Sequence, residues 1–215
     1  MTQAAYGVAA DRYDARTEFY QGWRNRLVAE LDTSPGDVVL DVGCGTGLCF
    51  DGLRRGVGPS GSVVGIDESL DMVRLARRRV AGRRWTNVSV LHSPVDRAQI
   101  PVVADKALFC AVHDVLQSYE ALRKVFEHLR PGARVVAGGG KYTTPWLFPL
   151  NMQVTALHRP FVRCFEGFAR PWSTLAYFLD DLKVTELALG TGFCAVGRAR
   201  AVMPHRPAGQ LSGAE

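Results

Sequence analysis

Three glycines at alternate positions mark the segment whose residue types point most directly to chemistry. Gly43, Gly45 and Gly47 follow an apolar run and open a short segment of helical pattern. Glycines at such a place permit a tight turn and let the backbone approach a ligand closely. Free N–H groups at a helix start favour a negatively charged group, and a carboxylate meets that requirement as well as a phosphate does. The segment therefore predicts the binding of a nucleotide-like cofactor.

An acidic residue stands at a matching distance along the chain. Asp67 ends the next apolar run, 20 residues after Gly47, and a carboxylate there can accept hydrogen bonds from both ribose hydroxyls. Nicotinamide or flavin binding is the competing interpretation, but its fingerprint has glycine at the sixth position of the loop. That position here is Leu48. The loop therefore lacks the glycine that packs helix against strand around a pyrophosphate.

These residues need a scaffold of strands and helices to position them. Apolar, β-branched runs alternate with segments of helical periodicity, which favours βαβ units and a parallel sheet. The strands are predicted at residues 38–42, 62–67, 88–91, 106–112 and 134–137, with two more joined at residues 190–192.

Helical periodicity between these runs predicts the layers around the sheet. Residues 15–31 predict one helix, with Phe19 and Trp23 among the apolar residues of its face. Ser69 and Ser118 are predicted N-caps of two later helices. A last helix is predicted from apolar residues at helical spacing, namely Leu175, Phe178, Leu179 and Leu182.

Taken together, the motifs resemble those of class I S-adenosylmethionine-dependent methyltransferases. Residues 40–47 are similar to the first motif of that family, and residues 64–69 followed by Met72 are similar to the second. Residues 129–133, before an apolar strand, are similar to the approach to the fifth strand. Tyr13-Asp14 and the compact C-terminus also resemble small-molecule members that methylate quinones and phospholipids.

The resemblance implies a fold and a division of the chain. The fold class is α/β, a Rossmann-like three-layer αβα sandwich whose seven-stranded, mostly parallel sheet has an antiparallel last strand. Residues 1–32 would form an N-terminal helical lid, and residues 33–199 the methyltransferase domain. Within that domain, residues 141–172 would be an aromatic segment on the substrate side. Residues 200–215, rich in Pro, Gly and Ala, are predicted to be a flexible tail.

The resemblance also implies S-adenosyl-L-methionine as the cofactor and distributes its contacts. Asp41 and the glycines would bound the methionine end, Asp67 would hold the ribose, and Met72 would pack beside the adenine. Ala111 and Val112, after the fourth strand, would line the methionine side. The predicted cofactor-binding residues are Tyr13, Tyr20, Asp41, Gly43, Cys44, Gly45, Gly47, Asp67, Glu68, Met72, Ser93, Pro94 and Ala111.

One departure from the family pattern concerns the adenine. The family often has an acidic residue after the third strand that contacts the adenine amino group. Ser93 takes that place here, so its contact is expected to be weaker or to run through the backbone. Asp96 is the alternative, although its register is wrong.

Candidate catalytic residues follow the fourth and fifth strands, whose carboxyl ends are the useful places in such a sheet. His113 could act as a general base or substrate anchor with Asp114 orienting it, or Asp114 could simply cap the next short helix. Lys141 and Tyr142 could face substrate, although a solvated loop is the favoured interpretation of these two.

Aromatic side chains gather before the first strand and after the fifth. In this topology both segments can fold over the methyl-donating end of the cofactor, which would imply an apolar or aromatic acceptor. The expected distribution is Trp23 in the core, Tyr13 and Tyr20 near the cofactor, and Tyr142 and Trp146 near substrate. No long cap is inserted between the strands, so the pocket is expected to be small or shared with a second subunit of a homodimer.

Composition and charge bear on three other kinds of function, namely nucleic-acid binding, metal binding and membrane insertion. The net charge of +5 comes largely from arginines between residues 74 and 84, and we interpret them as the solvated face of a helix, so no nucleic-acid partner is expected. The five cysteines form no CxxC pair and the histidines have no ligand spacing, so no metal site is predicted. The chain shows neither a signal peptide nor a run of about 20 apolar residues, which predicts a cytoplasmic protein without stable membrane insertion.

The leading functional hypothesis is methyl transfer from S-adenosylmethionine to an oxygen, nitrogen or carbon of an apolar or aromatic small molecule. A second hypothesis keeps the cofactor but assigns another reaction, such as a cyclisation or rearrangement. A third is a nucleic-acid methyltransferase that uses the arginine-rich helix. The chain has no Asn/Asp-Pro-Pro-aromatic catalytic motif, which disfavours the third.

Overall fold

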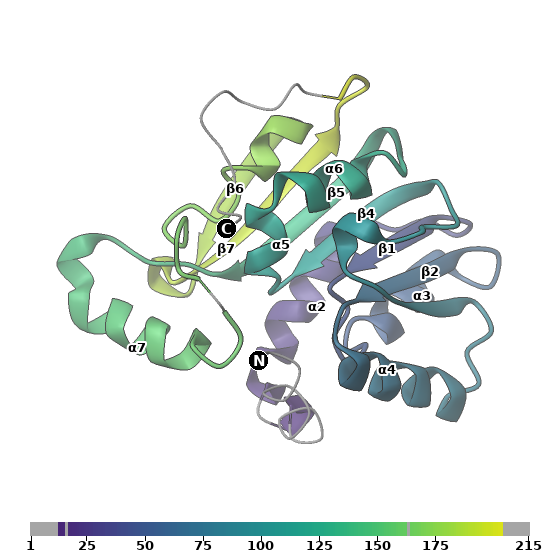
Figure 1. Cartoon of the computed structure of the whole chain (residues 1–215), viewed down its shortest axis with the longest axis horizontal. Helices are drawn as coiled ribbons and strands as arrows, with labels where there is room; N and C mark the ends of the chain where they lie inside the picture. Colours follow the sequence, from purple (N-terminus) through teal and green to yellow (C-terminus); the bar gives the residue numbers. More distant parts are fainter. Residues whose placement is uncertain (1–12, 16, 163, 204–215) are drawn as a thin grey trace.

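A parallel sheet with a reversed strand near one edge organises the molecule (Figure 1). The structure is a computed structural model that describes residues 13–15, 17–162 and 164–203. In this part of the chain the strands are β1 (Val38–Val42), β2 (Ser62–Asp67), β3 (Val88–His92), β4 (Ala104–Cys110), β5 (Leu129–Gly140), β6 (Leu179–Leu187) and β7 (Gly192–Ala199). They form one sheet in the order β3-β2-β1-β4-β5-β7-β6, in which β7 runs antiparallel to both neighbours. The predicted seven-stranded sheet with an antiparallel last strand is confirmed.

Helices cover both faces of this sheet, which makes the three layers predicted from the sequence. Their bounds are α2 (Gln21–Glu30), α3 (Phe50–Val57), α4 (Leu70–Gly82), α5 (His113–Gln117), α6 (Tyr119–Phe126) and α7 (Phe148–His158). Short 3-10 helices are η1 (Glu18–Tyr20), η2 (Val95–Arg97), η3 (Pro145–Leu147), η4 (Leu175–Phe178) and η5 (Ala188–Gly190). Helix α7 stands beyond the ends of the strands, well away from α4 (Figure 1). None of the described helices combines the length and the apolar character needed to cross a membrane.

Two hydrophobic cores, one on each face, follow from the alternation of side chains along the strands. In β1, Val39 belongs to the core under α2, α3 and α4, whereas Leu40 and Val42 belong to the core under α5, α6 and η4. Both faces of β1 are buried, which is why the strand is a nearly continuous apolar run. Asp41 interrupts that run with a carboxylate that is 1% exposed.

The order of the strands fixes where a ligand can bind. From β1 the chain proceeds outward through β2 to β3, and then returns to place β4 on the other side of β1. The loops after β1 and β4 therefore diverge, leaving a crevice at the carboxyl ends of these strands. The two predicted N-caps are present. Ser69 Oγ accepts from Met72 N–H at 3.4 Å at the start of α4, and Ser118 Oγ accepts from Ala121 N–H at 3.2 Å at the start of α6.

The predicted last helix is wrong. Residues 175–178 form only a 3-10 turn, and β6 begins at Leu179. The register of β6 against β7 shifts between Asp180 and Lys183, and Asp181 has φ +53°. This bulge brings Leu179 and Leu182 to the same core, a spacing that a regular strand would not give. The bulge thus reproduces the apolar spacing of a helix.

The predicted helix over residues 15–31 is shorter than expected. From Thr17 onward, regular α-helix covers only Gln21–Glu30, preceded by the 3-10 turn η1. Trp23 packs partly buried against the core, as expected, but Phe19 is 64% exposed and does not belong to the apolar face. The change of helix type after Thr17 rotates Phe19 away from the direction that four-residue spacing predicted.

Candidate functional site

The glycine loop after β1 has the backbone geometry that only glycine adopts readily. Gly43, Gly45 and Gly47 all have positive φ angles, of 67°, 54° and 80°. A side chain at Gly43 would also place its Cβ 2.3 Å from Val112 Cγ1, in the loop after β4. The N–H groups of Gly43 and Cys44 both donate to the Ile66 carbonyl of β2. The loop is therefore held between the two strands that flank β1.

Asp67, at the end of β2, holds the loop from the other side. Its two carboxylate oxygens accept from Gly45 N–H and Ser69 N–H, both at 2.8 Å. Burial raises the pKa of Asp67, and these two backbone donors oppose the rise. Each oxygen keeps a second lone pair, so the carboxylate can still accept hydrogen bonds from a ligand.

Asp41 is a buried carboxylate without a partner. Neither of its oxygens has a hydrogen-bond partner in the described part of the chain. Burial, and after it the neighbouring Asp67 carboxylate, raises the pKa of Asp41 to about 7. Because an unpaired buried carboxylate costs free energy, its retention at a cavity wall points to a ligand that carries a cation or a hydrogen-bond donor.

One cavity, of about 380 Å³, lies over the ends of β2 and β4. Asp67, Glu68 and Met72 line it, together with Pro94 and Asp96. Ser93 is not among the lining residues, and its backbone N–H donates to the Asp67 carbonyl. The prediction that Ser93 takes the acidic place therefore finds no support in the geometry, whereas Asp96, whose register looked wrong, lies at the cavity because η2 turns the chain back toward it.

A second cavity, of about 250 Å³, adjoins the first and shares Tyr13, Gly43, Gly45 and Ala111 with it. Asp41 and Cys44 also line this second cavity. Most of its wall is apolar, with contributions from Tyr20, Trp23, Leu116, Val154, Leu157, Phe161, Phe168 and Pro171. Every predicted cofactor residue lines one of the two cavities except Ser93 and Gly47, which line neither.

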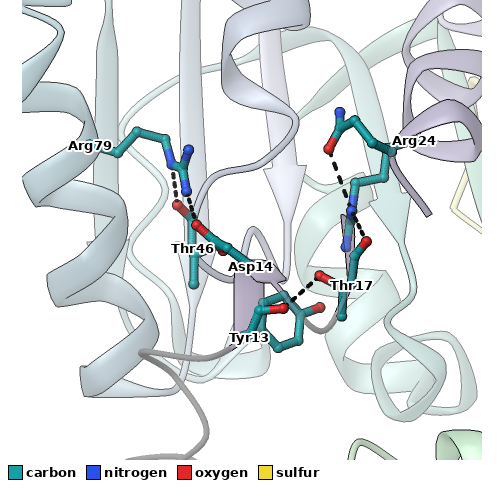
Figure 2. A network of polar contacts seen from close by, with 7 residues as sticks. Tyr13, Asp14, Thr17, Arg24, Thr46 and Arg79 are labelled. Atoms are coloured by element: carbon teal, nitrogen blue, oxygen red, sulfur yellow. Dashed lines mark hydrogen bonds and ion pairs between the residues drawn. The ribbon is translucent and has the colours of Figure 1, made fainter. Parts of the chain in front are cut away.

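The N-terminal segment is held against the glycine loop by contacts of Asp14 with Thr46 and Arg79, which we call the clasp (Figure 2). Asp14 accepts from Thr46 Oγ1 at 2.6 Å and forms an ion pair with Arg79 of α4. Arg79 Nε donates in turn to the Thr46 carbonyl at 2.8 Å. Tyr13, the neighbour of Asp14, therefore lies over the junction of the two cavities.

Arg24 is a cavity residue that the sequence did not reveal. It is 6% exposed, and its Nη1 donates to the Thr17 carbonyl at 2.8 Å (Figure 2). No described carboxylate forms an ion pair with it. Its guanidinium interacts with the Tyr13 hydroxyl and opposes the rise in the Tyr13 pKa that burial causes. A buried, uncompensated guanidinium at a cavity wall is suited to an anionic group of a ligand.

The predicted catalytic and substrate residues divide between the cavity and the surface. His113 lines both cavities and Asp114 lines one, but His113 Nε2 donates to the Glu166 carbonyl at 3.0 Å, so this carbonyl and not Asp114 orients the ring. Tyr142 and Trp146 line neither cavity. The Tyr142 hydroxyl bonds Thr155 Oγ1, and Trp146 is 93% exposed, so the geometry gives no support to substrate contacts by either.

Lys141 differs from the favoured interpretation as a solvated loop residue. It is 5% exposed, because its ammonium pairs with Glu186 at 2.9 Å and donates to the Gly190 carbonyl at the same distance. It therefore holds the β6–β7 connection to the end of β5. Within the described residues no cluster of side chains has the composition of a metal site.

His158, at the end of α7, is a further cavity residue, to which the sequence assigned no role in the site. It lines the apolar cavity together with Gly138, Gly139 and Gly140 of β5. A Cβ at Gly140 would come within 2.2 Å of His158 Nε2. Three consecutive glycines at the end of a buried strand were the signal that could have found this contact, since they indicate a close approach by another group.

Comparisons with known proteins identify the family of this arrangement. Residues 39–132 match the family model described as a methyltransferase domain. The chain is 35% identical over 127 residues to an uncharacterised 37.1 kDa protein in transposon Tn4556 of Streptomyces fradiae, with 58% of this chain and 36% of the relative covered. It is 30% identical over 149 residues to a demethylmenaquinone methyltransferase of Staphylococcus aureus, with 67% and 59% covered. The chain thus spans less than two thirds of these relatives.

Solved structures show the same fold at low sequence identity. One is a chain from the complex between the Haloferax volcanii Trm112 methyltransferase activator and a methyltransferase. It shares 16% identity with a TM-score of 0.71, and the match covers 95% of this chain and 100% of that one. The likeness supports the architecture of the sheet.

Proposed function

Because the chain belongs to the class I S-adenosylmethionine-dependent methyltransferases, we propose that it transfers a methyl group from S-adenosylmethionine to an apolar or aromatic small molecule. The observation that carries the proposal is the pair of adjoining cavities. One is bordered by Asp67 and Met72, and the other by the unpartnered Asp41 and an apolar wall. Such a pair of cavities provides adjoining places for a nucleoside, an amino-acid moiety and an acceptor, in that order along the crevice.

The residues of the crevice fit this cofactor. Asp67 would accept from the ribose hydroxyls, and Met72 would pack against the adenine in the larger cavity. Asp41 would hold the ammonium of the methionine moiety and Arg24 its carboxylate, so that each of these buried charged groups gains a partner of opposite sign. When bound, the cofactor supplies an electrophilic methyl group on a sulfonium.

The acceptor would lie in the apolar cavity. Its wall contains mainly aliphatic and aromatic side chains, with His113 among the few polar ones. Such a wall favours a largely uncharged acceptor and excludes water from the methyl transfer. The relative that methylates demethylmenaquinone is compatible with an acceptor of this kind. Orientation of the nucleophile toward the methyl group would be the main contribution of the protein.

Calorimetry with S-adenosylhomocysteine is the first test. We expect the wild-type protein to bind it and Asp67→Asn to bind about 10- to 100-fold more weakly, since hydrogen bonds to a charged group contribute about 1.5–3 kcal/mol. Asp51→Asn is the matched control, because the Asp51 side chain is about half exposed, at 47%, and among the described residues its ion pair is with Arg55 on the surface of α3. Absence of binding to the wild type, or equal binding by Asp67→Asn, would overturn the cofactor assignment.

Mass detection of products tests the reaction. The protein is incubated with S-adenosylmethionine and a panel of apolar phenols, amines and quinols, and methylated products are expected. A product of unchanged mass would favour the alternative of a non-methylating reaction. Tight binding of duplex DNA or RNA at physiological salt would favour a nucleic-acid methyltransferase, although Arg77 and Arg79 of the arginine-rich helix are used internally, on the Val90 and Thr46 carbonyls.

The homodimer predicted from the sequence stays a prediction that sedimentation can test. Exposed apolar side chains on η3 and α7 form the surface where a second copy would be sought, namely Trp146, Leu147, Phe148, Met152 and Leu157. A sedimentation coefficient that falls on replacing Phe148 with Ser would support a dimer through this surface. A monomer at all concentrations would exclude it.

A further inference from the structure

Two imidazoles flank a single buried ring at the end of the apolar cavity. The ring centroids of His113 and His158 lie 4.8 Å and 5.5 Å from that of Phe168, each in an edge-on arrangement. Phe168 is 1% exposed, so it fixes the inner side of both imidazoles. The two histidines come from α5 and α7, and both line the apolar cavity.

Hydrogen bonds to backbone carbonyls fix the tautomer of each imidazole. His158 Nδ1 lies 2.9 Å from the Val154 carbonyl, so Nδ1 must carry the proton. His113 Nε2 lies 3.0 Å from the Glu166 carbonyl, so there Nε2 carries it. A neutral imidazole has one N–H and one lone pair. The bare nitrogens are therefore Nε2 of His158 and Nδ1 of His113.

Only one of the two bare nitrogens is accessible. His113 Nδ1 is sealed from solvent and has no hydrogen-bond partner among the described residues. His158 Nε2 also lacks a described partner, but it is not sealed, and it lies against Gly140 where β5 ends at the cavity. A molecule in the cavity can thus contact the lone pair of His158 but not that of His113.

We propose that His158 is the general base of the reaction and that the acceptor is an uncharged aromatic compound whose hydroxyl donates to His158 Nε2. This inference rests on the proposed function and names its substrate class. The hydroxyl O–H bond breaks and its proton goes to Nε2, while an O–CH₃ bond forms from the oxygen lone pair. The S–CH₃ bond breaks, and its electron pair stays on sulfur, which leaves S-adenosylhomocysteine and an imidazolium.

The environment of His158 keeps the base in its active, neutral form. Burial lowers the pKa of His158 below its ordinary value near 6.5, and the bond to the Val154 carbonyl only partly opposes this. Burial also lowers the pKa of His113, which faces it across Phe168. The other ionisable groups that line this cavity are Tyr13, Tyr20, Arg24, Asp41, Cys44, Cys49 and Cys110. No described carboxylate pairs with His158, so nothing there holds the imidazolium in the resting protein.

The test compares His158→Gln with His128→Gln. His128 makes the same bond from Nδ1 to the carbonyl four residues earlier, Lys124 at 2.9 Å, but lies outside the cavity. The probe acceptor is 1-naphthol with S-adenosylmethionine, and methylated naphthol is measured by mass. His158→Gln should lower kcat by about 100-fold or more with little change in KM, because general-base catalysis contributes on this scale. His128→Gln should match the wild type, and both variants should bind S-adenosylhomocysteine normally.

The pH profile supplies a readout that a structural role would not move. The wild-type kcat should fall toward acidic pH as His158 takes a proton, at a pH below the ordinary imidazole value of 6.5 because burial lowers the pKa of His158, and this acidic limb should be absent in His158→Gln. Nitrogen-detected NMR of the imidazoles should show Nδ1–H and bare Nε2 for His158 at pH 7.

Several results would overturn the proposal. They are the opposite tautomer, an unchanged acidic limb in His158→Gln, loss of that limb in His113→Gln alone, and no methylation of 1-naphthol by a wild type that binds S-adenosylhomocysteine. A wild type that does not bind S-adenosylhomocysteine would instead refute the proposed function itself.

Discussion

The cofactor half of the crevice and the acceptor half are fixed by different kinds of interaction. The loop after β1 is held by backbone: positive φ angles at the glycines, the Ile66 carbonyl and the two bonds from Asp67. The acceptor half, residues 141–172, is held by side chains. Tyr142, Phe165 and Phe168 pack ring against ring, with centroids 4.9–5.9 Å apart. Side-chain packing can be changed by single substitutions without altering the sheet, so the acceptor half is where specificity can vary.

A single added methyl group in the glycine loop is expected to have the largest effect on the cofactor half. Gly43 and Gly45 both have positive φ, but a Cβ at Gly43 would clash with Val112, whereas a Cβ at Gly45 meets nothing within 4 Å. We expect Gly43→Ala to lower the free energy of unfolding by about 3 kcal/mol, because left-handed strain and overpacking add. Gly45→Ala should cost only about 1–2 kcal/mol of strain.

Urea unfolding and calorimetry with S-adenosylhomocysteine measure this pair of variants. Gly43→Ala should also abolish detectable binding, because its loop must move away from Val112. Equal effects of the two substitutions would show that backbone conformation alone, and not the close approach of the loop after β4, fixes the cofactor half.

The second prediction separates stability from binding at Asp41. With a pKa of about 7 in the folded protein and an ordinary value of 3.8 when unfolded, the folded state holds one more proton between these pH values. The free energy of unfolding therefore falls as pH rises from about 4 to 7, and the loss persists above pH 7. Asp41→Asn should remove this loss and be more stable than the wild type at pH 8 by about 4 kcal/mol, since each pKa unit corresponds to about 1.4 kcal/mol, with little difference at pH 4.

The same substitution should weaken S-adenosylhomocysteine binding by about 10- to 100-fold, the effect expected for a hydrogen bond between charged groups. Thermal unfolding at the two pH values and calorimetry measure the two effects. Asp51→Asn, which removes a half-exposed carboxylate, is the control for net charge. If Asp41→Asn were less stable than the wild type at pH 8, Asp41 would not be an unpaired charge in the free protein.

The same contrast explains what the sequence could predict. Glycines with positive φ, Asp67 at the end of a strand and the alternating cores leave signals that are local along the chain, so the sheet and the cofactor half followed from spacing. The β6 bulge could not be predicted from spacing, because a shifted register gives Leu179 and Leu182 the apolar spacing of a helix.

The sequence did not predict that Arg24 and His158 lie at the cavity, and the reason is different. Each reaches the cavity through contacts between residues distant in sequence, such as His158 on Gly140, and no periodic pattern reports such a contact. Trp146 shows the converse error. Its aromatic character suggested a pocket, but its position on η3 leaves it exposed.

The third prediction concerns the clasp that joins the N-terminal segment to the cofactor half. Asp14→Asn removes the ion pair to Arg79, whose partners are 45% and 27% exposed, so the cost to stability should be at most about 1 kcal/mol. If the clasp holds Tyr13 over the bound cofactor, the dissociation rate of S-adenosylhomocysteine should rise about 5-fold. Stopped-flow displacement measures the rate, with Asp51→Asn as the control. An unchanged rate would mean that residues 13–20 do not retain the cofactor.

The smallest expected effect belongs to the acceptor half. Trp146→Ala should change the free energy of unfolding by less than about 0.5 kcal/mol, because a side chain that is 93% exposed buries little surface. It should also leave S-adenosylhomocysteine affinity and the KM for 1-naphthol unchanged, since Trp146 lines neither cavity. Phe161→Leu is the contrasting variant, because Phe161 lines both cavities and packs its ring on Tyr13 at 5.6 Å. A tenfold rise in KM for Trp146→Ala would mean that η3 and α7 fold inward over a bound acceptor. Side-chain packing would then let the acceptor half rearrange while the backbone of the cofactor half stays in place.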